Sequence, residues 1–130
     1  MESFHGVIIE ESLADKEVLK QVEVISTKVE PVTDRHHTPW LSQWTLHQVA
    51  VPAGKADAVA ERLSVALECE HPWYADFNNE TTHYIIFRGR VFKINRRSKE
   101  EYDQAKQYGL SLGIAAHQVD FHPEVADWKR

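Results

Sequence analysis

The sequence predicts an α+β fold in which two helices cover one face of a mostly antiparallel sheet. Three observations indicate this class. Several short segments are rich in β-branched and aromatic residues, which is typical of strands. Two segments, residues 54–70 and 98–113, carry apolar residues at helical spacing. A tight β-hairpin lies between these two segments, at residues 84–94.

The 130-residue chain has the length of one ordinary domain. Its first part contains two extended stretches, residues 4–10 and 18–32, and we expect them to pair with each other as a hairpin. The segment that follows shows no periodicity and is expected to be a surface loop. Along the chain we therefore expect N-terminal strands, a loop, the α+β core and a tail, at residues 1–32, 33–43, 44–122 and 123–130.

From Trp44 onward the predicted order is strand, helix, two or three strands, helix and strand. Pro52 ends the first strand, and Pro72 ends the first helix. Ser98 and Glu101 have the spacing of a capping box at the start of the second helix. This order resembles the ferredoxin-like split βαβ arrangement, which implies that both helices pack on one face of the sheet.

The two sides of the hairpin follow from its turn. A two-residue loop of Gly89 and Arg90 fits a type II′ turn, because glycine adopts the positive φ that the first position requires. In this register Phe87 faces Phe92, and the alternation of side chains separates two faces. The predicted apolar face carries Ile85, Phe87, Phe92 and Ile94; the predicted mixed face carries Tyr84, Ile86, Arg88, Val91, Lys93 and Asn95.

The mixed face is the predicted binding surface. If the preceding strand, residues 73–77, pairs with the hairpin, its polar residues join this face. With both helices on the apolar face, the mixed face is left for the N-terminal strands, a second subunit or a ligand. Aromatic rings beside a few polar groups are typical of small-molecule sites. We therefore expect a small-molecule or partner-binding module that uses Tyr74, Asp76, Tyr84, Lys93 and Asn95.

Asp76 and His83 support an alternative, a small hydrolase or isomerase that works by acid–base chemistry, with or without a metal bound by His and Asp. Asp76 lies among aromatic residues, where loss of hydration would make its carboxylate a stronger base. His83 faces Arg96 in the predicted register, and that cation would favour a neutral imidazole. The sequence contains no Ser-His-Asp motif, nucleophile elbow or glycine-rich phosphate loop. A pure protein-interaction module is the third interpretation.

The eight histidines also suggest a test for bound metal, because imidazole is a common metal ligand. There is no HExxH motif and no cysteine pair, so the short ligand spacing of structural zinc is absent from the sequence. Asp120 and His122 stand two residues apart beside a predicted last strand at residues 117–121, and they are the candidate metal ligands. Scattered, hydrogen-bonded histidines are the simpler interpretation, and no cofactor is expected.

Charge and cysteine usage restrict the remaining partners. The formal net charge of −5 argues against a general nucleic-acid binder, which carries a basic surface. The single cysteine, Cys69, excludes an internal disulfide framework and indicates a reducing compartment. Because no signal peptide or apolar run of about 20 residues is evident, we expect a cytoplasmic protein that does not enter a membrane. We also expect a homodimer, since a half-covered sheet is commonly completed by a second copy.

Overall fold

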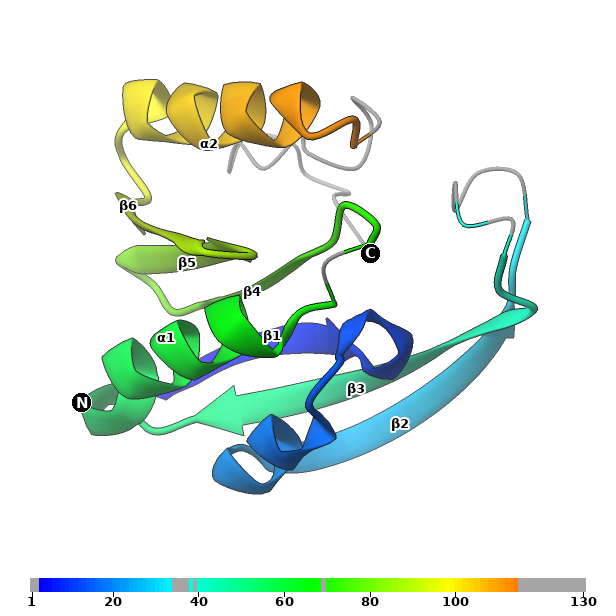
Figure 1. Ribbon diagram of the computed structural model, residues 1–130. Helices are drawn as coiled ribbons and strands as arrows, with labels where there is room; N and C mark the ends of the chain where they lie inside the picture. The colour runs from blue at the N-terminus through cyan, green and yellow to red at the C-terminus, as the bar shows by residue number, and fades with distance from the viewer. Residues whose placement is uncertain (1–2, 34–37, 39, 69, 115–130) are drawn as a thin grey trace.

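The computed structural model describes residues 3–33, 38, 40–68 and 70–114, and in this part six strands form one antiparallel sheet (Figure 1). The strand order is β2-β3-β1-β4-β5-β6. The strands are β1 Phe4–Ile9, β2 Glu23–Pro31, β3 Gln43–Val51, β4 Tyr74–Asn78, β5 Thr82–Phe87 and β6 Arg90–Asn95. The helices are α1 Ala56–Ala66 and α2 Lys99–Ser111, with 3-10 turns η1 Glu10–Ser12, η2 Lys16–Gln21 and η4 Ala53–Lys55. The predicted α+β class, with an antiparallel sheet and two main helices, is confirmed.

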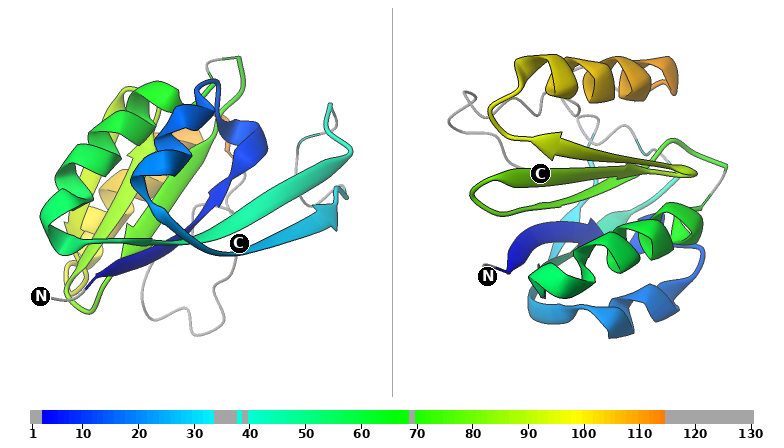
Figure 2. Two further views of the ribbon diagram at one scale, coloured as in Figure 1. Left: turned by 90° about the horizontal axis from the view of Figure 1, so that it is seen from below. Right: turned by 90° about the vertical axis from the view of Figure 1, so that its left-hand side faces the viewer.

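The two helices cover opposite faces of the sheet, with α2 on one side and α1 on the other (Figures 1 and 2). Tyr84 and Ile86 of β5 belong to the apolar cluster that contains α1. Ile85 and Phe87, which alternate with them, belong to the cluster that contains α2. The expectation that both helices share one face is therefore wrong. The physical reason is that β5 is apolar on both sides, and such a strand is stable only when both sides are covered.

β1 occupies the middle of the sheet, between β3 and β4. The predicted N-terminal hairpin is wrong, because β3 lies between β1 and β2. Burial explains the arrangement: Ile8 and Ile9 of β1 are buried, whereas β2 is exposed along most of its length and forms one edge. The start of the predicted stretch 18–32 is η2, whose N-cap Asp15 accepts a hydrogen bond from the Glu17 amide.

A split βαβ unit is present, although a different strand divides it. β3 and β4 each pair antiparallel with β1, so they run parallel to each other, and α1 connects them. In the ferredoxin-like pattern, the strand that lies between the two parallel strands comes after them in the sequence. Here the strand between β3 and β4 is β1, which comes before them. Residues 117–121, the predicted last strand, lie outside the described residues. None of the described helices is long and apolar enough to cross a membrane.

The β5–β6 hairpin bends one residue earlier than predicted, at Arg88 and Gly89. Gly89 has a φ of +74°, and Phe87 pairs with Arg90. The turn is held against α1, because the Gly89 amide donates to the Ser64 carbonyl at 2.9 Å and the Arg88 guanidinium donates to two carbonyls near the end of that helix. Because the bend moves by one residue, each residue of β5 faces a β6 residue two positions from the predicted one. A shift of two positions leaves every side chain on its predicted face, so the predicted assignment of β5 and β6 side chains to two faces is kept.

Candidate functional site

The five residues predicted to bind a ligand do not share a face. Tyr74 pairs with Phe87 and Asp76 pairs with Ile85, so both lie on the α2 side of the sheet. Lys93 and Asn95 pair with Tyr84 and Thr82, on the α1 side. The predicted common face is therefore wrong. The reason is the register of β4, in which Phe77 stands opposite Tyr84, so that Phe77 and Ala75 share its face.

Tyr84 itself is closed off by α1. Its side chain is 3% exposed, its ring packs against Phe4 and Phe77, and its hydroxyl donates to Asp57 in the first turn of α1. The Lys93 ammonium lies 3.3 Å from Asp57 and 5.5 Å from the Tyr84 ring centroid. Burial, followed by the bond to Asp57, raises the pKa of Tyr84, and the bonds from Tyr84 and Lys93 lower the pKa of Asp57. The contacts of Asp57 with Tyr84 and Lys93 hold α1 against the sheet.

The structure brings Asp76 and His83, the predicted acid–base pair, into direct contact. His83 Nε2 lies 2.8 Å from Asp76 Oδ2, and His83 Nδ1 lies 3.1 Å from the Tyr102 hydroxyl of α2. All three side chains are buried, at 2–3% exposure. Burial raises the pKa of Tyr102, which stays protonated and bridges the sheet to the helix. His83 faces Ile94 across the hairpin rather than Arg96. The pair is buried beside α2, and its acid–base role stays a prediction.

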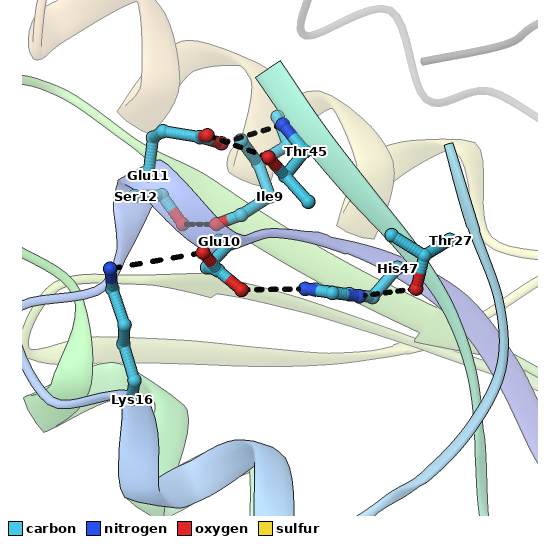
Figure 3. Close-up of polar contacts among 8 residues, drawn as sticks. All are labelled: Ile9, Glu10, Glu11, Ser12, Lys16, Thr27, Thr45 and His47. Carbon is cyan, nitrogen blue, oxygen red and sulfur yellow. Dashed lines mark hydrogen bonds and ion pairs between the residues drawn. The ribbon is translucent and has the colours of Figure 1, made fainter. Parts of the chain in front are cut away.

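A second polar network joins η1 to the β2–β3 ribbon (Figure 3). His47 of β3 lies 3.1 Å from a Glu10 carboxylate oxygen and 2.9 Å from the Thr27 hydroxyl of β2. Glu11 accepts hydrogen bonds from both the amide and the hydroxyl of Thr45. The side chains of Glu10 and Glu11 thus hold η1 against β3.

Glu68, Glu70 and His71 have ligand atoms close enough together to hold a metal ion. Glu68 is already engaged, however: it accepts from the Trp73 indole and the Glu70 amide, and it lies 2.6 Å from His71 Nδ1. Burial would raise the pKa of Glu68, but these hydrogen bonds outweigh it and lower the pKa. The Glu68 carboxylate is therefore already hydrogen-bonded to three neighbouring groups. The predicted metal ligands, Asp120 and His122, lie outside the described residues.

The feature that the sequence does not reveal is the edge that β6 forms in the sheet of the described residues. Within the described chain β6 pairs only with β5. The Asn95 amide donates to the Glu101 carboxylate at 3.1 Å and therefore points away from β5, whereas the neighbouring Arg96 amide donates to Thr81 on the β5 side. Because amides in an antiparallel pair alternate between the two sides, the peptide groups of Val91 and Lys93 also point outward. They present two N–H donors and two C=O acceptors at the edge.

A groove of about 530 Å³ runs beside this edge, between β6 and α2. Its apolar floor is formed by Phe92 and Tyr108, whose ring centroids are 5.6 Å apart, with the Arg90 guanidinium over both rings. Its wall is a stripe of α2 at helical spacing: Glu100, Asp103, Gln104 and Gln107. On the other side of the edge a second groove is lined by Lys93 and Asn95, so two of the predicted ligand-binding residues do border an open surface.

The stripe on α2 is visible in the sequence, but polar residues at these positions are typical of an ordinary solvated helix face. Only the strand order shows that this face stands over an open strand edge. No protein-family model, curated protein or solved structure matches the chain.

Proposed function

We propose that the protein is a binding module that takes an extended segment of a partner protein as an added strand at the β6 edge. Strand addition uses backbone hydrogen bonds for affinity and side-chain pockets for specificity. The observation that carries the proposal is the outward direction of the Val91 and Lys93 peptide groups beside the groove under α2. The proposed function belongs to the class predicted from the sequence, a partner-binding module, but it uses a different surface.

The opposite edge of the sheet is less suited to adding a strand. β2 has a bulge between Val24 and Ser26, carries Lys28, and ends at Pro31, which has no amide hydrogen. Bulges, lysine and proline are the devices that natural sheets use to block edge pairing. β6 pairs regularly with β5 along its whole length and contains no proline. Lys93 on β6 disfavours pairing with the β6 edge of a second copy, because two lysines would meet. A strand without a positive charge opposite Lys93 can still pair at this edge.

The test removes one outward amide. In Val91→Pro the outward N–H is lost, and the β5–β6 ladder is kept because that N–H takes no part in it. We expect peptides selected from a display library against the wild-type protein to bind this variant about tenfold more weakly, the effect of one lost hydrogen bond and one unsatisfied carbonyl. Val91→Ala is the matched control, since it loses the side-chain packing but keeps the amide, and it should change the affinity less than about threefold.

Amide hydrogen exchange checks the premise directly. The N–H groups of Val91 and Lys93 should exchange quickly in the free protein, whereas those of Phe92 and Ile94 should be protected by β5. A bound peptide should slow exchange at Val91 and Lys93 selectively. The proposal is refuted if selected peptides bind Val91→Pro and wild type equally, or if exchange at this edge does not change on binding.

A second candidate partner is another copy of the chain, at β2. Val24, Ile25 and Val29 are 41%, 55% and 55% exposed, and apolar side chains gathered on one strand are typical of an interaction surface. Light scattering should give a dimer mass that Val29→Lys reduces to a monomer mass. Val65→Lys is the control, because Val65 is equally apolar and 62% exposed but lies on α1. A monomer at high concentration would remove this candidate.

A further inference from the structure

We infer that the segment bound at the β6 edge carries a basic residue followed, two or four positions later, by an apolar or aromatic residue. This inference rests on the proposed function and specifies the partner by its chemistry. It follows from the order of charged and aromatic side chains along the groove and from the direction in which α2 runs.

The groove has two chemically different ends. α2 follows β6 after residues 96–98 and runs back along it, since Glu101 contacts Asn95 at one end and Tyr108 contacts Phe92 at the other. Glu100 and Asp103 are exposed and line the end near Asn95. No basic side chain of α2 lines the groove in the described chain. The other end is aromatic, with Arg90 lying over the two rings.

The spacing follows from helix and strand geometry. A helix rises about 1.5 Å per residue, so Asp103 and Glu100 stand about 7.5 Å and about 12 Å before Tyr108. An extended chain rises about 3.3 Å per residue and returns to the same face every second residue. A basic side chain that meets Asp103 therefore lies two positions from an apolar side chain over Tyr108, and one that meets Glu100 lies four positions away.

The order of the two residues follows from the direction of pairing. Antiparallel pairing is slightly more stable per residue than parallel pairing, so the bound segment is expected to run from the Asn95 end toward the Arg90 end. It meets the acidic residues first and the aromatic floor second. Because Glu101 already occupies the Asn95 amide, backbone pairing stops at Lys93, and the recognised segment is short.

The experiment is a peptide-display selection on two forms of the full chain, the wild type and Glu100→Lys combined with Asp103→Lys. The wild type should enrich peptides with Lys or Arg two or four positions before an apolar residue. The double variant should lose this preference and bind those peptides about three- to tenfold more weakly, as expected for two exposed charge pairs. Glu61→Lys is the control, because Glu61 is exposed on α1, away from the groove, and should leave binding unchanged.

The outcomes separate this inference from the proposed function. Peptides that depend on the Val91 amide but show no basic preference, or show the reverse order, overturn the inference and leave strand addition intact. A selection in which no peptide depends on the Val91 amide overturns both. If the charge-reversed variant does not fold, Glu100→Gln with Asp103→Asn keeps the shapes and removes the charges, and the same loss of preference is expected.

Discussion

Gly6 of β1 stands where the sheet has no room for a side chain. A β-carbon at this position would lie 2.0 Å from the Asp76 carbonyl oxygen and 2.7 Å from the Phe77 α-carbon, both on the backbone of β4. Ordinary contacts begin near 3.4 Å, so Gly6→Ala forces β1 and β4 apart by more than about 1 Å in the middle of the sheet. Three residue pairs join these strands. At about 1 kcal/mol per hydrogen bond, with the lost packing added, we expect a loss of about 3–5 kcal/mol.

Urea unfolding followed by far-UV circular dichroism measures this loss, and domains of this size usually have only about 5–15 kcal/mol in total. Gly54→Ala is the matched control: nothing lies within 4 Å of the position that a β-carbon would take there, so its effect should stay within about 1 kcal/mol. The reasoning fails if Gly6→Ala loses less than about 1 kcal/mol, because β1 and β4 would then not be paired as described.

Three further changes test other parts of the fold. Tyr102→Phe should cost about 1–3 kcal/mol in the same assay, since it removes a buried hydroxyl that bonds His83; an unchanged midpoint would contradict that contact. Ser98→Ala should cost about 1 kcal/mol by removing the cap of α2, and Ser98→Asp should restore it. Because burial raises the folded-state pKa of Tyr84 and Tyr102, stability should be full below pH 10 and fall as pH rises above it, and each Phe variant should make that fall less steep.

Local signals in the sequence predicted most individual elements. One half of the predicted capping box is observed, because Ser98 Oγ accepts from the Glu101 amide; the Glu101 side chain accepts from the Asn95 amide instead of the Ser98 amide. The helix predicted at residues 54–70 is observed as Ala56–Ala66. Such features depend on neighbours a few residues away, so a single sequence contains the information needed to find them.

Features that depend on distant segments were predicted less well. Nothing local to β1 indicates that it separates β3 from β4, and nothing local to β4 indicates that Phe77 rather than Asp76 shares the face of Tyr84. One clue was available: the run from Ile85 to Phe87 is apolar without alternation, which indicates a strand covered on both sides. That clue would have placed the helices on opposite faces.

The dependence on distant segments also explains why the candidate site lies at an edge of the sheet and not on the predicted face. Asp76 and His83, buried polar groups of β4 and β5, contact each other, and His83 also contacts Tyr102 of α2. Among the described residues, backbone hydrogen-bonding capacity remains where a strand has one neighbour, at β2 and β6. Of these two, β6 has the regular register and the adjacent groove. Lys93 and Asn95 were predicted as ligand-binding residues because of their side chains, which the sequence gives directly. The capacity proposed to bind a partner is that of the peptide groups along the same strand, which becomes visible only when the strand order is known.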